Sequence, residues 1–392
     1  MTAAAEGQTG RYLVLMEKGE GWNEATRVLN QVAGIQAVDS AEGGLDEPLW
    51  AADGLLMQPL GVALVNADPE QMRALTAAAE DPFRPIALVE PEREVAAISA
   101  PTEVVPLVDE ATLTWGLQAV NANISTKTGK GMRVAVLDTG FDLTHPEFAG
   151  RSVSSRSFVQ NEDVQDLHGH GTHCIGTSCG PRNPEQKPGY GVAYEAAIFA
   201  GKVLSNRGSG ADGGILAGIS WAIENGCRIV SMSLGAPTTP TSAYSRLFEE
   251  IAQRAMKAGT LIIAAAGNES KRAQGHIAPV SHPANCPSIM SVGAVDSAMK
   301  VANFSCGTVG NIGAVDVVAP GVDVHSSWPM AKGRYARLQG TSMATPHVAG
   351  VAALIAEQTE ARAWELWARL MQSAKRLPLP STDVGAGLVQ AP

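Results

Sequence analysis

The chain has 392 residues, of which 45% are hydrophobic, and its formal net charge is -10. This length and composition allow a large buried core, as in one large domain with a smaller one beside it. The acidic balance and the lack of a Lys/Arg cluster argue against a nucleic-acid partner, because phosphates bind to basic surfaces. The longest apolar runs are well short of the roughly 20 residues that span a bilayer, so no membrane partner is expected.

The N-terminus and the cysteines bear on the compartment. The first 22 residues contain no basic leader followed by an apolar stretch, which favours a cytoplasmic protein, or a secreted one whose leader was trimmed. The five cysteines lack the regular spacing of a disulfide framework, so we expect buried thiols, as in a reducing compartment. They are Cys174, Cys179, Cys227, Cys286 and Cys306.

The first hundred residues predict a small α+β domain. Apolar runs favour strands over 11–19, 61–67 and 84–92, and helical periodicity favours amphipathic helices over 23–34 and 69–81. This order is βαββαβ-like, close to the ferredoxin-like arrangement, and about 90 residues suffice for such a unit to fold alone.

A linker and an α/β pattern follow. Residues 95–108 combine small side chains with two prolines and predict an extended linker. Beyond it, near-continuous apolar runs predict strands buried on both faces, with helices over 211–226 and 242–259 between some of them. The runs span 132–140, 196–204, 228–235, 259–268, 288–296 and 315–321. This pattern indicates an α/β domain with a mostly parallel sheet between helices, whose active groups gather at the carboxyl ends of the strands.

Three residues at strand ends and helix starts suit nucleophilic catalysis. Asp138 ends a predicted strand, His170 precedes a helical run of small residues, and Ser342 begins another such run after Gly340. A serine is a weak nucleophile unless a base accepts its proton, and an imidazole is an effective base when a carboxylate fixes its tautomer. Asp, His and Ser supply these three roles.

Five segments of the chain resemble the signature segments of the subtilisin-like serine proteases, or subtilases, in the same order. They are VAVLDTG (134–140), HGTHCIGT (170–177), SMSLG (231–235), AAAGNES (264–270) and GTSMATPHVAG (340–350). The resemblance spans roughly residues 110 to 390, and Asp, His, Ser is the subtilisin order of the catalytic residues. It implies a three-layer catalytic domain over 101–392 that cuts protein or peptide substrates through an acyl-enzyme, with no cofactor required for the chemistry.

The resemblance assigns a role to each of four residues. Asp138 is the charge-stabilising carboxylate, His170 the general base and Ser342 the nucleophile. Asn268 ends a buried strand, and its side-chain amide is expected to join the main-chain N–H of Ser342 in an oxyanion hole. A catalytically silent peptide-binding protein with the same cleft is the alternative from another class, and these four intact residues argue against it.

The resemblance also implies where an extended substrate binds, by pairing its main chain with strand edges. Ser233, Leu234 and Gly235 are expected to pair with one side of the peptide, and Gly208, Ser209 and Gly210 with its other side. The pocket for the residue before the scissile bond is expected to be lined by Ala265, Ala266 and Gly267. Such small wall residues imply a roomy, largely apolar pocket. Its floor lies within 275–283, whose length departs from the family pattern and leaves the specificity open.

The N-terminal part carries a second resemblance. Residues 61–94 resemble the later half of a subtilisin propeptide. This implies that residues 1–100 are a prodomain that assists folding, leaves its last strand in the cleft after self-cleavage at 98–100, and inhibits the enzyme. A prefolded template suits a parallel sheet, which forms through distant contacts and folds slowly.

A zinc site is the chemical alternative to the triad. His168, His170, His173 and Cys174 lie within seven residues, with helical spacing from His170 to the last two. Glycines at 169 and 171 favour a turn, and the HExxH pattern is lacking. We therefore expect His173 in the core. Cys174, one turn after His170, is expected either beneath the triad, where mercurials or oxidation would impair activity, or as an inert buried thiol.

Structural calcium is common in the family and stays open here. Glu147 occupies a position where the family often has an aspartate ligand, whereas the partner loop over 179–191 differs from the Asn-rich calcium loop. The sequence fits two roles for Asp142, Asp163 and Asp166 equally well, that of a solvated loop charge and that of a calcium ligand.

Overall fold

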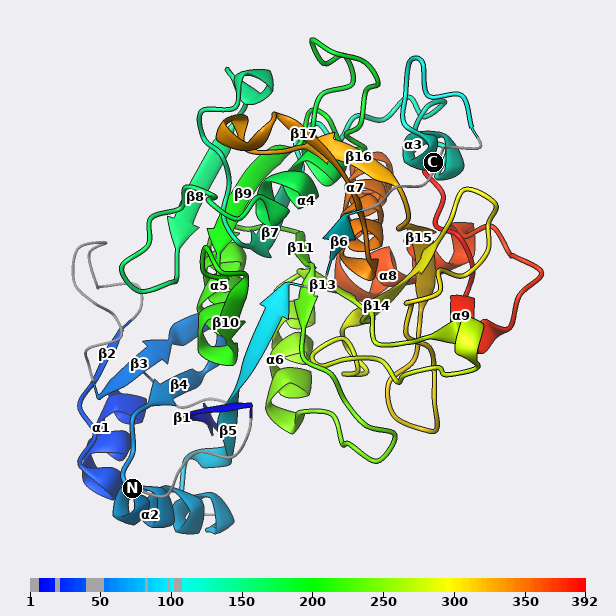
Figure 1. Ribbon diagram of the computed structural model, residues 1–392. Coiled ribbons are helices and arrows are strands. Elements are labelled where there is room, and N and C mark those ends of the chain that lie inside the picture. Colours follow the sequence, from blue (N-terminus) through cyan, green and yellow to red (C-terminus); the bar gives the residue numbers. More distant parts are fainter. Residues whose placement is uncertain (1–6, 18–21, 40–52, 82–83, 98, 102–107) are drawn as a thin grey trace.

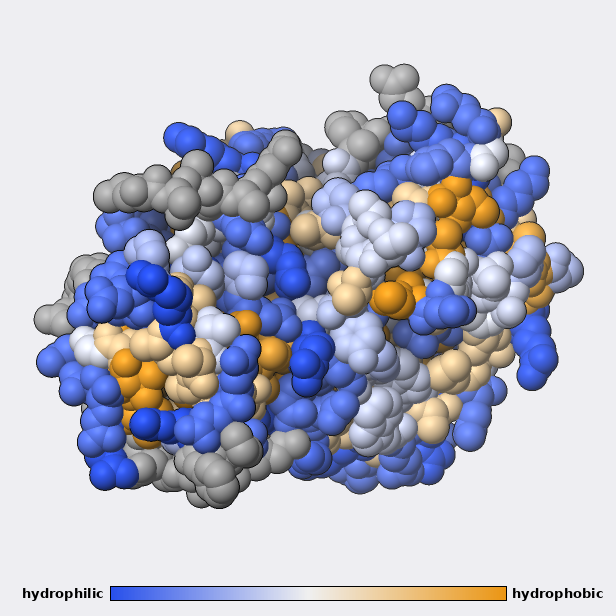
Figure 2. Space-filling view, turned by 90° about the horizontal axis from the view of Figure 1, so that it is seen from below, coloured by the Kyte–Doolittle hydropathy of each residue, from blue (hydrophilic) through white to orange (hydrophobic). Residues whose placement is uncertain are grey.

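A computed structural model of the chain describes residues 7–17, 22–39, 53–81, 84–97, 99–101 and 108–392. It has a small N-terminal unit and a larger unit, and the strand β5 (Ile86–Ala97) extends from the first onto the second (Figure 1). On the face seen in Figure 2, hydrophilic side chains predominate and hydrophobic ones form small, separate areas. No helix in the described ranges has the length and apolar character needed to cross a bilayer. All five cysteines are described, and they are buried and free, as expected.

The N-terminal unit is a sheet with two helices on one face. The strand order is β5-β1-β4-β3-β2, antiparallel except that β2 pairs parallel with β3. The elements before β5 are β1 (Gln8–Met16), α1 (Trp22–Ala33), β2 (Ala37–Asp39), β3 (Gly54–Met57), the 3-10 helix η1 (Gln58–Leu60), β4 (Val62–Val65) and α2 (Pro69–Glu80). Without β2, this order is the one expected of a βαββαβ unit.

Alternation along β1 explains why both faces of this sheet are buried. Val14 and Met16 join a small core with residues of α1 and α2, whereas Leu13 and Leu15 join the large core of the second unit. Successive side chains of a strand point to opposite faces. One sheet therefore packs on its own helices and also against α5 (Asp212–Glu224) and α6 (Arg246–Lys257) of the larger unit.

The larger unit is built on seven parallel strands in the order β15-β14-β13-β11-β7-β9-β8. They are β7 (Arg133–Asp138), β8 (Val153–Ser157), β9 (Ala197–Lys202), β11 (Ile229–Met232), β13 (Leu261–Ala265), β14 (Met290–Val295) and β15 (Val317–Pro320). The six predicted strands are all present. The strand β8 was not expected, because its sequence VSSRS has no apolar run, and as a partly exposed edge strand it needs none.

Helices cover both faces of this sheet, as predicted. The helices α4 and α7 pack on each other, and α5 and α6 lie on the side that meets the N-terminal unit (Figure 1). The other helices are α3 (Trp115–Ala119), α4 (His170–Cys179), α7 (Thr341–Thr359), α8 (Ala363–Ser373), α9 (Ser381–Val384) and the 3-10 helices η2 (Pro146–Phe148), η3 (Arg272–Gln274) and η4 (Met330–Lys332). The central α7 is rich in small residues because its neighbours approach closely. A Cβ at Gly350 would lie 2.5 Å from that of Val192.

Short strands beside the main sheet correct the predicted linker. The strands β10 (Ser209–Ala211) and β12 (Leu234–Gly235) both pair with β5, and β6 (Ala100–Pro101) joins the hairpin of β16 (Val324–Ser327) and β17 (Tyr335–Gln339). Residues 95–97 thus belong to a paired strand, because exposed strand edges on the larger unit supply partners for their main chain. Residues 98 and 102–107 lie outside the described residues.

Candidate active site

Asp138 and His170 form a buried pair. Asp138 is the last residue of β7, and His170 is the first residue of α4. Nδ1 of His170 donates to Oδ1 of Asp138 at 2.7 Å, and neither side chain is more than 1% exposed. The main-chain N–H of Thr139 donates to the same oxygen at 2.7 Å. Because the proton of the neutral ring stays on Nδ1, Nε2 is left as the proton acceptor.

The electrostatics of this pair strengthen the base. Burial is the largest single effect on the pKa of His170 and lowers it, but Asp138 and, to a lesser extent, Cys174 together outweigh burial and hold that pKa well above 6.5. Nε2 of His170 is buried and has no hydrogen-bond partner among the described residues. A strengthened base with an available lone pair meets the requirement for general base catalysis.

A second carboxylate, that of Asp166, holds the loop before α4. Oδ1 of Asp166 accepts hydrogen bonds from Oγ1 of Thr139 and from the main-chain N–H of His168, both at 3.0 Å. Its Oδ2 accepts from the main-chain N–H and the hydroxyl of Thr172, in the first turn of α4, at 2.9 and 2.7 Å. These bonds tie the start of α4 to the end of β7, and thereby fix where His170 lies.

Ser342 lies in the first turn of α7, beside the pair. Pro346 has no N–H, so the carbonyl oxygen of Ser342 lacks its usual helical hydrogen bond. That oxygen instead accepts from Oγ of Ser233 at 2.7 Å and from Sγ of Cys174 at 3.5 Å. Sγ of Cys174 is also 3.9 Å from Nδ1 of His170. The packing of α4 on α7 therefore brings the predicted nucleophile and base to one place.

The hydroxyl of Ser342 forms a hydrogen bond with the main chain. Its Oγ donates to the main-chain oxygen of Ser233 at 3.0 Å. Rotation about the Cα–Cβ bond of Ser342 is the motion that would carry the hydrogen towards Nε2 of His170. The structure thus brings the three predicted residues together, and the hydroxyl of Ser342 donates its hydrogen to the main-chain oxygen of Ser233.

Asn268 is oriented by the N-terminus of α7. Its Oδ1 accepts hydrogen bonds from the main-chain N–H and from Oγ1 of Thr341 at 2.9 and 2.8 Å. The oxygen and the NH₂ group of an amide project from one carbon, so these two bonds fix the side on which Nδ2 lies. Asn268 therefore lies beside a helix N-terminus, where main-chain N–H groups favour negative charge, and next to the residue before Ser342.

The strand β5 lies in a groove between β10 and β12. On one side it pairs antiparallel with β10, and the main-chain N–H of Ala97 donates to the oxygen of Gly208 at 2.8 Å. On the other side Leu234 of β12 lies opposite Ala97. The six residues predicted to flank a substrate are in or next to these two strands. They are Gly208, Ser209 and Gly210 on one wall and Ser233, Leu234 and Gly235 on the other.

The predicted pocket wall is buried at the end of β13. It consists of Ala265, Ala266 and Gly267. Gly267 has a φ of +110°, and a Cβ there would lie 2.2 Å from Oγ of Ser281 and 2.5 Å from Oε2 of Glu269. Oγ of Ser281 donates to Oε2 of Glu269 at 3.0 Å. Polar groups thus lie against Gly267, and the expectation of a largely apolar pocket stays a prediction.

The histidines around His170 do not form a zinc site with it. Nε2 of His173 bonds to main-chain oxygens of the β16–β17 hairpin at 3.0 and 3.2 Å, and burial lowers the pKa of His173 to about 3. Nδ1 of His168 accepts the main-chain N–H of His170 at 3.4 Å. His173 is thus the core residue that was expected. In the described ranges, the ligand atoms that lie within 4.8 Å of one another belong to Asp138, His170 and Cys174, where Nδ1 of His170 is already bonded to Asp138.

The surroundings of Glu147 do not fit the calcium role considered for it. Its oxygens accept from the hydroxyls of Tyr190 and Tyr335 and from the main-chain N–H of Glu185, and Arg334 lies 3.6 Å away. A calcium ion needs carboxylate and carbonyl oxygens directed at it. The described groups around Glu147 bring hydrogens and positive charge instead, so this carboxylate is already bound within the protein.

Two loop carboxylates have structural roles that the sequence analysis missed. Asp142 is buried and accepts hydrogen bonds from Thr144, Gln165 and the main-chain N–H of Met330. Asp166 is also buried and holds the start of α4, so neither is a solvated charge, whereas Asp163 is exposed. The position of Asp166, four residues before α4, was the available signal, because carboxylates satisfy the N–H groups at helix starts.

Comparison with known proteins agrees with this geometry. The model of the subtilase family matches residues 129–387. The chain is 35% identical over 401 residues to the alkaline protease of Alkalihalobacillus alcalophilus, covering 100% of this chain and 93% of that protein. It is 36% identical over 364 residues to the M-protease of Shouchella clausii strain KSM-K16, covering 91% and 84%. It is 42% identical over 228 residues to the subtilisin of Bacillus pumilus, covering 58% and 78%.

The family match covers well over half of the chain, and relatives align with nearly all of it. Catalysis in this family requires no cofactor, and a catalytically silent peptide-binding protein finds no support among these relatives. From its fold, its site and these relatives, the chain belongs to the subtilase family of serine endopeptidases.

Proposed function

We propose that the chain is a zymogen, which cuts itself near residues 98–100 and keeps its N-terminal unit bound as an inhibitor. The observation that carries this proposal is the position of β5, which pairs with β10 and β12 as an extended substrate would. On this proposal residues 1–100 are the prodomain with its linker, and residues 101–392 are the catalytic domain. Ile98, at the proposed junction, lies outside the described residues.

In the proposed reaction, the hydroxyl of Ser342 turns from Ser233 to Nε2 of His170. His170 takes the proton as Oγ of Ser342 bonds to the peptide carbonyl carbon, and Asp138 stabilises the imidazolium. Nδ2 of Asn268 and the main-chain N–H of Ser342 donate to the oxyanion. His170 then returns the proton to the leaving amine as the C–N bond breaks. Water hydrolyses the acyl-enzyme through the same two proton transfers in turn.

Two glutamates of β5 support the inhibitory role of the N-terminal unit. Oε1 of Glu92 accepts the main-chain N–H of Gly213 at 2.8 Å, in the first turn of α5. Glu90 accepts the hydroxyl of Ser245, the N-cap of α6, at 2.6 Å and the main-chain N–H of Leu247 at 3.2 Å. Helix N-termini favour negative charge. These carboxylates therefore hold β5 against the two helices that face it.

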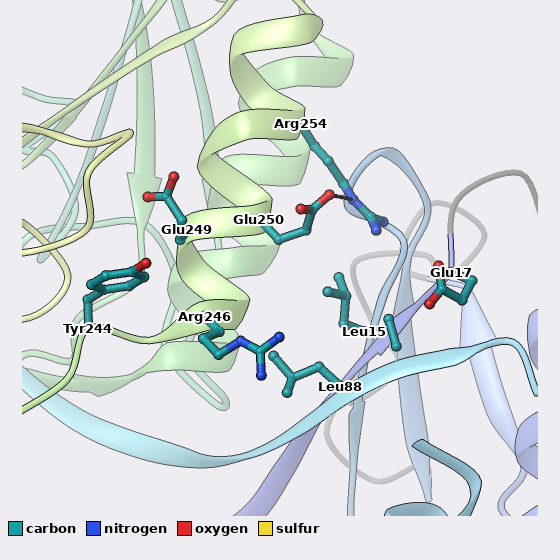
Figure 3. A pocket seen from close by; sticks show the side chains of 9 residues that line it. Leu15, Glu17, Leu88, Tyr244, Arg246, Glu249, Glu250 and Arg254 are labelled. Carbon is teal, nitrogen blue, oxygen red and sulfur yellow. Dashed lines mark hydrogen bonds and ion pairs between the residues drawn. The ribbon is translucent and has the colours of Figure 1, made fainter. Parts of the chain in front are cut away.

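The rest of this contact is partly polar. Arg254 of α6 donates to the main-chain oxygens of Leu60 and Met16 at 2.6 and 3.0 Å and pairs with Glu250 at 3.3 Å (Figure 3). A pocket of about 370 Å³ lies beside it, between α6 and the strands β1 and β5 (Figure 3). Contacts that rely on hydrogen bonds and ion pairs are typical of parts of a protein that can separate.

Labelling with a fluorophosphonate probe tests the catalytic assignments. We expect the parent chain to be labelled at Ser342 and Ser342→Ala to be unlabelled. Ser373→Ala, which changes a serine on α8, is the matched control and should be labelled like the parent. Labelling that persists in Ser342→Ala would place the nucleophile elsewhere. A parent chain that stays unlabelled after its N-terminal unit has been removed would indicate a silent binding protein.

A further inference from the structure

A hydrogen bond between two side chains joins the two walls of the groove that holds β5. Asp212, the first residue of α5, directly follows β10 on one wall. His282 lies on the other wall, where it pairs with Ala236, the residue after β12. Nε2 of His282 is 3.0 Å from Oδ1 of Asp212, and both side chains are buried. The pair therefore spans the groove at the end distant from Ser342.

The strand in the groove contacts the second oxygen of the same carboxylate. Oδ2 of Asp212 accepts the main-chain N–H of Arg93 at 3.1 Å. Nη1 of Arg93 lies 3.9 Å from Oδ2, and it is buried without a hydrogen-bond partner among the described residues. The other end of the guanidinium lies 3.7 Å from Glu90, which belongs to β5 itself. A substrate that replaces β5 would therefore contact Asp212, which belongs to the larger unit. At the position of Glu90, which belongs to β5, it would have its own residue.

The end of β10 explains why a side chain, and not the main chain, accepts the N–H of Arg93. Main-chain pairing between β10 and β5 ends where Ala211 lies opposite Glu94. The next residue on the wall, Asp212, starts a helix, so its carboxylate replaces the main-chain oxygen as acceptor for the strand. The ring of Phe248 meets the imidazole of His282 edge to face at 4.7 Å, which fixes the ring that orients this carboxylate.

We propose that Asp212 forms a distal subsite for a basic residue of the substrate, at the position that Arg93 occupies, with His282 as its positioning residue. The subsite binds the main-chain N–H with Oδ2 and favours arginine or lysine, because a buried carboxylate gains from a nearby cation. If the cut follows residue 98, this is the sixth residue before the scissile bond. The inference rests on the proposed function, in which β5 follows the path of a substrate.

Peptide substrates test the subsite in the processed protein after its N-terminal unit, whose Arg93 occupies the subsite, has been removed. Three peptides of identical sequence carry Arg, Ala or Glu at the sixth residue before the cut, and a fourth carries N-methylarginine. A tetrapeptide substrate that ends before this position gives the reference rate. We expect KM to rise about fivefold for Ala, more than tenfold for Glu and about fivefold for the N-methyl peptide, with smaller changes in kcat.

Variants separate the charge of Asp212 from its role as acceptor. Asp212→Asn retains an oxygen for the N–H, so it should lose the preference for Arg over Ala and keep sensitivity to N-methylation. Asp212→Ala should lose both. His282→Leu should raise KM for long peptides relative to the tetrapeptide. His282→Gln retains a hydrogen-bond donor, so KM for long peptides should stay close to that of the parent. Asp163→Asn removes an exposed carboxylate elsewhere and should behave like the parent in every comparison.

A second measurement needs no turnover. In the full-length Ser342→Ala chain, hydrogen exchange at the amide of Arg93 should speed up about tenfold on adding Asp212→Ala, while the amide of Ala97 stays protected. Equal exchange with and without Asp212, or a preference for Arg that survives Asp212→Ala, would overturn the subsite. Failure of the parent to cleave the tetrapeptide would instead count against the proposed function, and the exchange experiment would still decide the inference.

Discussion

The hydroxyl of Ser342 donates to the main-chain oxygen of Ser233 at 3.0 Å, whereas Nε2 of His170 has no hydrogen-bond partner among the described residues. The proposed nucleophile and the proposed base are thus held on adjacent helices without a hydrogen bond between them. The carbonyl oxygen of Ser342 accepts the hydroxyl of Ser233 in return, at 2.7 Å. Ser233 therefore anchors the start of α7 from the wall of the groove.

The pair of Asp138 and His170 predicts how activity depends on pH. His170 must be neutral to accept a proton, and the carboxylate of Asp138 holds its pKa well above 6.5, against the effect of burial. A raised pKa keeps the ring protonated to higher pH, so kcat/KM should rise with pH through a step above 6.5. Asp138→Asn should lower kcat about 10⁴-fold and move this step to lower pH. An unchanged step in Asp138→Asn would show that another group controls the profile.

Asn268→Leu should lower kcat about 10²- to 10³-fold with little change in KM, the magnitude known for loss of one oxyanion donor in subtilisin itself. The reason is that Nδ2, oriented by the two bonds that Thr341 donates to Oδ1, is proposed to donate to the oxyanion of the intermediate. Steady-state kinetics with a peptide substrate measure both constants. Asn183→Ala, at an exposed loop position, is the control. A loss confined to KM would assign Asn268 to substrate binding alone.

Cys174 should make the enzyme sensitive to mercurials. Burial raises the pKa of its thiol, so reaction is slow, but Sγ lies 3.9 Å from Nδ1 of His170 and 3.5 Å from the oxygen of Ser342. A bound mercury atom there would displace the triad. Residual activity after incubation with a mercurial should fall in the parent and in Cys227→Ala, and persist in Cys174→Ala. Equal inhibition of the two variants would indicate that another thiol is responsible.

Glu92→Ala should weaken the hold of the N-terminal unit on the rest of the chain. It removes a buried carboxylate that pairs with Arg11 at 2.7 Å and accepts the N–H of Gly213, so both of these contacts are lost. The free energy that holds the N-terminal unit in place should fall by about 3 kcal/mol, a loss typical of breaking a buried ion pair. Protease digestion of the unit within the Ser342→Ala chain should be faster. Glu94→Ala, at an exposed position of the same strand, should leave the digestion rate unchanged.

Positions that bear strong local patterns were predictable from the sequence. The continuous apolar runs gave the six central strands, and Asp138 lies at the carboxyl end of one of them, β7, as expected of a parallel sheet. Ser342 lies in the first turn of the small-residue helix α7. In these cases burial on both faces requires apolar or small residues throughout the segment, so each segment can be recognised from its own sequence.

Features that depend on pairing between distant segments were not predictable. The edge strand β8 and the β16–β17 hairpin have no continuous apolar run, because β8 is partly exposed and β16 buries the polar residues Ser326 and Ser327. The extent of β5 depends on strand edges of the larger unit, and these small residues by themselves suggested a linker. The role of Asp166 depends on donors from Thr139 and Thr172, on either side of it in the chain.

The mass of the purified full-length chain tests the central claim most directly. The parent should be recovered as two fragments divided near residues 98–100, because its own site cuts the segment that follows β5. Ser342→Ala, expressed and purified in the same way, should remain a single chain, and adding a little of the processed parent should show whether the junction is accessible to cutting. If Ser342→Ala is divided at the same place as the parent when expressed alone, another protease makes the cut and the account of self-processing is wrong.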